Sequence, residues 1–194
     1  MCSLFRNKYR NETFRLTNHD YSSDCKYFIT ICTLRKEPCF GNISCGKMIL
    51  SETGQIAYKI WYDLPKHFAF VSIDEFVVMP NHIHGIVIIE STTIVGTLHA
   101  TSLQQQQQQQ TIPPVRTLHA TSAKNEFMST ISPKTGSLPT VIRSYKSAVS
   151  KNVHLTDRGF SWQPRYYDHL IRSDREMDRI RKYIINNPVK WDDQ

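Results

Sequence analysis

Two histidines, His82 and His84, stand at the head of an apolar run that extends over residues 85–89. The run is short, rich in β-branched residues and preceded by a proline, a pattern typical of a buried β-strand. Residues two apart on a strand point to the same face of the sheet, so both imidazoles should project side by side while Ile83 enters the core. Two imidazoles fixed in parallel on a rigid sheet are suited to binding a metal ion.

The remaining segments alternate between strand and helix patterns. β-Branched and aromatic residues predict strands over residues 27–34, 42–50 (the weakest), 72–79 and 82–90, and an extended segment over 160–171. Apolar residues at helical spacing predict three helices. The first is capped by Ser51 and ends at Pro65, the second covers residues 138–151, and the third begins at Ser173 and stops at Pro188. This order predicts an α+β fold of the ferredoxin-like (RRM-like) kind, with an antiparallel sheet, helices on one face and an added C-terminal helix.

Residues 91–137 depart from this pattern. The hexapeptide Thr-Leu-His-Ala-Thr-Ser occurs at residues 97–102 and again at 117–122, with an unbroken glutamine run at 104–110 between the copies. A stretch of this length without secondary structure is atypical of a compact domain. We interpret it as a low-complexity, disordered insertion loop within a single domain that spans residues 1–194.

Charge and cysteine content narrow the classes of partner and compartment. The net charge is +7 and the isoelectric point is about 9.2, which favours a polyanionic partner, nucleic acid first. The five cysteines are odd in number and form no C-x-x-C pair, which argues against a disulfide framework and against a thiolate zinc site. The first 11 residues lack an apolar core and no apolar run is long enough to span a membrane, so we expect a cytoplasmic protein.

The predicted last helix carries a second pair of polar residues. Tyr183 and Asn187 are four positions apart, so they share one helical face, while Ile184 lies on the adjacent, core-facing side. If this helix packs across the sheet near His82 and His84, Asn187 can complete a metal site with three protein ligands. The hydroxyl of Tyr183 can then reach a group bound at that site.

Both motifs resemble those of one enzyme family. Residues 79–85, Met-Pro-Asn-His-Ile-His-Gly, resemble the HUH motif (histidine, hydrophobic residue, histidine) of single-tyrosine transposases. Residues 183–188, Tyr-Ile-Ile-Asn-Asn-Pro, resemble the nucleophile helix of REP-associated tyrosine transposases, which have asparagine as third metal ligand where insertion-sequence relatives have glutamine. Residues 144–149 and 162–169 also resemble this group, and the resemblance covers residues 12–90 and 138–191.

The resemblance implies a transposase that acts as a metal-dependent endonuclease and strand transferase on single-stranded DNA at palindromic, REP-like hairpins. The reaction would pass through a 5′-phosphotyrosine intermediate. By this resemblance Tyr183 would be the nucleophile, and His82, His84 and Asn187 would bind Mg²⁺ or Mn²⁺. It further implies a nucleoid-associated protein that is a monomer or a homodimer, with hairpin or single-stranded DNA as its partner.

Basic and aromatic residues around the motifs are candidate DNA contacts. Lys146, Arg172, Arg179 and Lys182 are expected to grip phosphates, with an affinity that falls as salt rises. Tyr167 is expected to stack against an unpaired base. Acidic residues are interspersed among the basic ones over residues 172–182, so a solvated, ion-paired helix face is an alternative interpretation for any one of them.

Other interpretations of the same residues stay open at this point. The two histidines could be structural, and Asn187 could serve only as the C-cap of its helix. Tyr145 is a rival nucleophile, although its place on the apolar stripe of its helix favours core packing. The alternative functions are a catalytically inactive hairpin-binding protein derived from a transposase, and an unrelated metallohydrolase.

Overall fold

The computed structural model describes residue 16 and residues 19–90 and 134–191. Most of the predicted insertion over 91–137 lies outside the described residues, so its interpretation as a loop stays a prediction. The elements are β1 (Cys25–Cys32), the short 3-10 helix η1 (Leu34–Lys36), β2 (Gly41–Ser44), β3 (Lys47–Leu50), α1 (Glu52–His67), β4 (Val71–Met79), β5 (His82–Ile89), α3 (Leu138–Val153), β6 (Tyr167–Ile171) and α4 (Asp174–Asn186).

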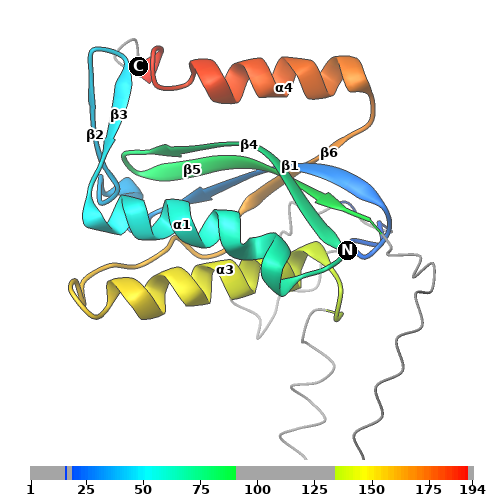
Figure 1. Cartoon of the computed structure of the whole chain (residues 1–194), viewed down its shortest axis with the longest axis horizontal. Coiled ribbons are helices and arrows are strands. Elements are labelled where there is room, and N and C mark those ends of the chain that lie inside the picture. Colours follow the sequence, from blue (N-terminus) through cyan, green and yellow to red (C-terminus); the bar gives the residue numbers. More distant parts are fainter. Residues whose placement is uncertain (1–15, 17–18, 91–133, 192–194) are drawn as a thin grey trace, which may run out of the picture. The chain divides into compact units, whose positions relative to one another are not determined.

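Four of the strands form one sheet in the order β4-β5-β1-β6, and each neighbouring pair is antiparallel. With α1 between β1 and β4, and α3 between β5 and β6, this is the ferredoxin-like connectivity that the sequence predicts. Helices α1 and α3 cover one face of the sheet, and α4 lies across the other (Figure 1). Within the described residues, no helix has both the length and the apolar character needed to cross a membrane.

The alternation of residues along β5 supplies a separate core to each face. Ile83 and Val87 belong to the large core beneath α1 and α3, together with Trp61 and Tyr145. Ile86 points to the opposite face and joins a smaller cluster under α4, whose other buried members are Ile171, Met177, Ile180 and Ile184. His82 and His84 share the parity of Ile86, so they also lie on the α4 face.

The differences from the prediction include a hairpin in place of one weak strand and a longer first helix. Residues 42–50 form a hairpin of β2 and β3, because Cys45 and Gly46 both adopt positive φ angles (49° and 70°) that turn the chain back on itself. Helix α1 continues past Pro65 to His67. Proline removes one backbone donor, but so close to the helix end the loss is small, and the amide of Phe68 still donates to the carbonyl of Leu64 at 3.0 Å.

Gly85 in the central strand β5 leaves the space that Trp61 of α1 occupies. A Cβ at this position would meet the indole ring of Trp61, and it would lie 3.0 Å from Cδ2 of Phe76. We therefore expect Gly85→Ala to lower the free energy of unfolding by about 1–3 kcal/mol, measured by urea denaturation. Gly159→Ala is the control, because the added methyl there meets the flexible Asp157 carboxylate. Equal stability of Gly85→Ala and the wild type would contradict this packing.

Candidate active site

The four residues singled out by the two motifs lie in one pocket. His82, His84, Tyr183 and Asn187 all line a cavity of about 290 Å³ between the sheet and the C-terminal end of α4. Thr30, Lys36, Asn81 and Trp191 contribute further walls. The last helix therefore folds back over the histidine pair, which is the condition that a site shared by the two motifs requires.

The two imidazoles converge through their Nε2 atoms, which are 3.0 Å apart. Each ring is held by a hydrogen bond at its other nitrogen. Nδ1 of His82 is 2.7 Å from the side-chain oxygen of Asn81, and Nδ1 of His84 is 2.8 Å from the hydroxyl of Thr30. An amide oxygen can only accept, so Nδ1 of His82 carries the proton and its Nε2 presents a lone pair to the pocket.

Burial keeps both histidines neutral. It lowers the pKa of His82 to about 4, with a further contribution from the positive charge of Lys36. Burial also lowers the pKa of His84 to about 3, and the neighbouring His82 adds to the effect. Neutral imidazole is the form that binds metals, so at neutral pH both rings are ready to act as ligands without releasing a proton.

Helix α4 is anchored to the sheet, and this fixes the positions of Tyr183 and Asn187. Its apolar residues Met177, Ile180 and Ile184 pack on the sheet. Arg181 donates two hydrogen bonds of 2.8 Å to the carboxylate of Asp74 on β4, and this contact lowers the pKa of Asp74. The predicted capping residue Ser173 accepts a bond from the amide of Glu176 at 3.2 Å.

Tyr183 projects from this helix beside the histidines. Its hydroxyl lies 3.3 Å from Nε2 of His84, and its ring meets the rings of His84 and Phe28 edge-on. The side chain is 48% exposed, so a large substrate can approach the hydroxyl from solvent.

Asn187 both caps α4 and lines the pocket. Its backbone amide donates to the carbonyl of Ile184 at 3.2 Å, and the residue is only 7% exposed. Within the described part of the chain its side-chain amide makes no hydrogen bond to another protein group, and its polar atoms stay accessible from the pocket. A carboxamide left free at the pocket wall suits a ligand role, so capping alone does not account for this residue.

These donors fit a divalent cation. Two ligand atoms that each lie about 2.1 Å from one ion, at a right angle, are about 3.0 Å apart, which matches the separation of the two Nε2 atoms. The free carboxamide of Asn187 supplies an oxygen donor to the same pocket. Among the described residues, no group of three or more His, Cys, Asp or Glu could hold a metal ion, so an ion here would depend on the two histidines and the amide. Binding of a divalent ion, Mg²⁺ or Mn²⁺, at this site stays a prediction.

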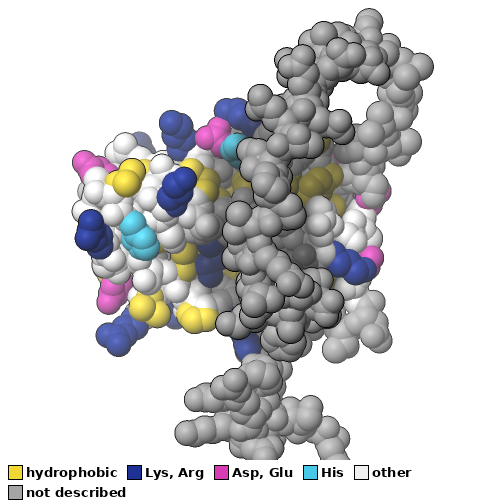
Figure 2. Space-filling model, turned by 90° about the horizontal axis from the view of Figure 1, so that it is seen from below, with side chains coloured by type: hydrophobic (Ala, Val, Ile, Leu, Met, Phe, Trp, Pro, Cys, Tyr) yellow, Lys and Arg dark blue, Asp and Glu magenta, His cyan; other side chains and the backbone are white. Residues whose placement is uncertain are grey.

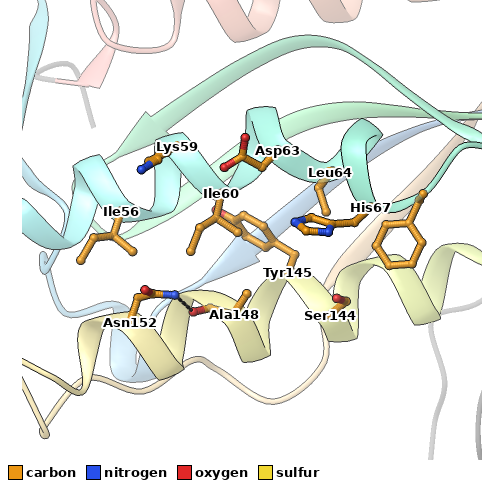
Figure 3. A pocket seen from close by; sticks show the side chains of 11 residues that line it. Ile56, Lys59, Ile60, Asp63, Leu64, His67, Ser144, Tyr145, Ala148 and Asn152 are labelled. Carbon is orange, nitrogen blue, oxygen red and sulfur yellow. Dashed lines mark hydrogen bonds between the residues drawn. The ribbon is translucent and has the colours of Figure 1, made fainter.

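The rival nucleophile Tyr145 is excluded by its surroundings. Its ring is completely buried, and its hydroxyl donates to the carbonyl of Ala57 at 3.0 Å. It lines instead a groove of about 300 Å³ between α1 and α3, on the opposite side of the sheet from the histidine pair (Figure 3). On the part of the face in Figure 2 that is not drawn in grey, acidic side chains lie among the basic ones.

The candidate DNA contacts fall into two groups. Arg172, Arg179 and Lys182 are exposed, on α4 or just before it, and Tyr167 is 53% exposed on the edge strand β6. Lys146 differs, because its ammonium group donates to the carbonyls of Gln163 and Arg165 at 2.8 and 3.1 Å. Contact of any of these residues with DNA stays a prediction, but Lys146 also has a structural role that its position on a helix did not reveal.

Sequence reasoning missed Lys36, which lines the pocket from η1. Lys36 and the preceding Arg35 both have positive φ angles, 58° and 55°, which non-glycine residues rarely adopt. The loop is held by Thr33, whose amide donates to the carbonyl of Asn81 at 2.9 Å. The lysine is thus tied to the turn that carries His82. Positive φ angles at non-glycine residues leave no signal in the sequence, so sequence reasoning could not place Lys36 in the pocket.

Comparisons with known proteins find a relative in sequence and a solved structure of similar fold. No family model matches the chain. A protein of Haemophilus influenzae, described only as uncharacterized, is 34% identical over 190 residues, which are 95% of this chain and 91% of that protein. A solved structure of a REP-associated tyrosine transposase bound to a REP hairpin is similar with a TM-score of 0.53 and 16% identity, over 91% of this chain and 74% of the other. At that identity the likeness shows a shared fold.

Proposed function

The chain belongs to the family of the Haemophilus influenzae protein and has the fold of the REP-associated tyrosine transposase, and on this premise we propose a function. The protein is a transposase-type enzyme that cleaves and rejoins single-stranded DNA at palindromic, REP-like hairpins. It uses Mg²⁺ or Mn²⁺ and forms a 5′-phosphotyrosine intermediate. One observation carries the proposal. The Tyr183 hydroxyl lies 3.3 Å from Nε2 of His84, one of two converging neutral imidazoles, in a pocket that the side chain of Asn187 also lines.

The reaction is a transesterification, in which one phosphodiester bond is exchanged for another. The phenolic oxygen of Tyr183 attacks the scissile phosphorus, the bond from phosphorus to the 3′ oxygen breaks, and the phenolic proton is lost as a free 3′-OH forms. A second 3′-OH can later attack the phosphotyrosine and rejoin the DNA. Phenol is a weak nucleophile at neutral pH, but fixing it beside the phosphate can contribute about 7 kcal/mol or more.

His82, His84 and Asn187 would hold the divalent ion. When bound, the ion would withdraw negative charge from a non-bridging phosphate oxygen. All three ligands are uncharged, and no carboxylate is among the described residues that line the pocket. A phosphate of the substrate therefore supplies the negative charge that the protein does not.

Lys36 is the cation that the pocket offers to this phosphate. Within the described residues its ammonium group forms no ion pair or hydrogen bond, so it is available to an anion. We expect Lys36→Gln to slow single-turnover adduct formation about 10- to 100-fold, the value of one charge-assisted hydrogen bond, and Lys36→Arg to restore much of the rate. Lys59→Gln, which changes a lysine at the remote groove between α1 and α3, is the control. An unchanged rate in Lys36→Gln would remove this residue from the mechanism.

The function is tested with end-labelled hairpin oligonucleotides taken from DNA around the gene, each with single-stranded flanks. The expected product with Mg²⁺ or Mn²⁺ is a protein–DNA adduct that survives denaturation, together with a fragment that ends in a 3′-OH. Chelation with EDTA should prevent both. Hairpin binding without an adduct under either metal would favour the catalytically inactive DNA-binding protein. Turnover of small phosphoesters without an adduct would favour a metallohydrolase.

A further inference from the structure

We propose that a second pocket, next to the histidine pocket, binds one unpaired nucleobase of the DNA strand that leads to the scissile phosphate. This inference rests on the proposed function and adds to it a site that determines specificity. The pocket has a volume of about 370 Å³ and lies between β1 and the segment before β6. Its walls include Thr30, Cys32, Gln163, Pro164, Arg165 and Tyr167.

The two pockets adjoin across β1. Thr30 and Cys32 line both of them, so one residue pair forms the floor from the histidines to the edge of the sheet. The register places His84, Thr30 and Tyr167 directly opposite one another on β5, β1 and β6. Neighbouring strands are about 4.8 Å apart, so the backbones at His84 and Tyr167 are about 10 Å apart, a distance that about three stacked nucleotides or fewer extended ones can span.

The wall chemistry favours a base over a phosphate. The surface is mostly apolar, with the rings of Pro164 and the half-exposed Tyr167 available for stacking. Arg165 is the one charged residue among the described residues of the lining, and the Gln163 side-chain amide has no hydrogen-bond partner within the same part of the chain. An aromatic face with a side-chain amide beside it can stack on a base and bind its polar edge.

The outer wall is held in a fixed conformation by Lys146. Its ammonium group donates to the carbonyls of Gln163 and Arg165, and the lysine carbonyl accepts a 3.1 Å bond from the indole of Trp162. The amide of Gln163 donates to the carbonyl of Cys32 at 2.9 Å. These bonds hold Arg165 at a φ angle of 68°, a strained conformation for a residue with a side chain. Lys146 is therefore a positioning residue for this pocket.

The test uses hairpins in which each unpaired nucleotide is replaced in turn by an abasic residue. Binding is measured by fluorescence anisotropy in EDTA, so the result does not depend on cleavage. We expect one position close to the scissile phosphate to lose about 10-fold or more in affinity for the wild type. Tyr167→Ala should lose a similar factor on intact DNA and show no further loss with that abasic hairpin. Tyr167→Trp should retain the wild-type pattern.

Two controls separate this pocket from general effects. Tyr58→Ala removes an aromatic ring of similar exposure from α1 and should keep the wild-type abasic pattern. Lys146→Met should weaken the preference at the sensitive position without changing how affinity depends on salt, whereas loss of a phosphate contact would reduce that dependence. Equal sensitivity to the abasic residue in Tyr167→Ala and wild type, or no sensitive position at all, would overturn the proposal. Failure to form an adduct would instead count against the proposed function alone.

Discussion

We expect Tyr183→Phe to form no covalent adduct with hairpin DNA, although it should fold and bind the hairpin as the wild type does. The substitution removes one oxygen atom, the one that lies 3.3 Å from Nε2 of His84. The phenyl ring keeps its edge-on contacts with Phe28 and His84, and the side chain is 48% exposed, so little packing is lost. Because no other atom of the side chain can form the phosphoester, the adduct signal should fall by at least about 10³-fold, to the detection limit.

The measurement is denaturing electrophoresis of the labelled adduct under single-turnover conditions, beside anisotropy of the same hairpin. Tyr145→Phe is the matched control, since it also removes a single phenolic oxygen. Its hydroxyl is buried against the carbonyl of Ala57, so we expect about 1 kcal/mol of lost stability and an intact adduct. An adduct that persists in Tyr183→Phe at the wild-type rate would show that another residue attacks the DNA.

His84→Ala is expected to lose metal-dependent cleavage by about 10²-fold or more while hairpin binding in EDTA stays close to wild type. His84 is the buried member of the pair, with Nε2 directed at His82 and at the Tyr183 hydroxyl. Its removal takes away one of the proposed ligands and leaves the others unable to hold an ion in place. Binding of Mn²⁺ in the presence of hairpin DNA, followed by electron paramagnetic resonance, should weaken in parallel.

His67→Ala is the control for this substitution, because His67 is an exposed histidine at the end of α1, on the opposite side of the sheet. It should bind Mn²⁺ and form adduct as the wild type does. If His84→Ala retained both properties, the histidine pair would have a structural role and the metal site would lie elsewhere.

Local periodicity was sufficient to predict the part of the site that comes from single elements. A strand has a repeat of two, so His82 and His84 had to share a face, and a helix places Tyr183 and Asn187 on one side. The order of strands and helices then predicted the ferredoxin-like sheet. The motif resemblance is confirmed at the level of the fold by the solved transposase structure.

Features that depend on contacts between distant segments could not be predicted in this way. The register that sets Thr30 beside His84 and Tyr167 is a tertiary property, and sequence patterns do not reveal it. Lys36 reaches the pocket through a backbone conformation that its residue type disfavours. Lys146 was predicted as a phosphate contact from its charge alone, yet it donates to backbone carbonyls 17 and 19 residues further along the chain.

The uncharged character of the three candidate metal ligands has a consequence for how this protein would operate. A cation that meets only imidazole and carboxamide groups gains little electrostatic attraction from the protein, whereas a nucleic acid backbone beside them supplies it. Each of the two then strengthens the association of the other, and thermodynamic reciprocity makes the factor the same in both directions. Such a centre would assemble only on its target and stay inert between encounters.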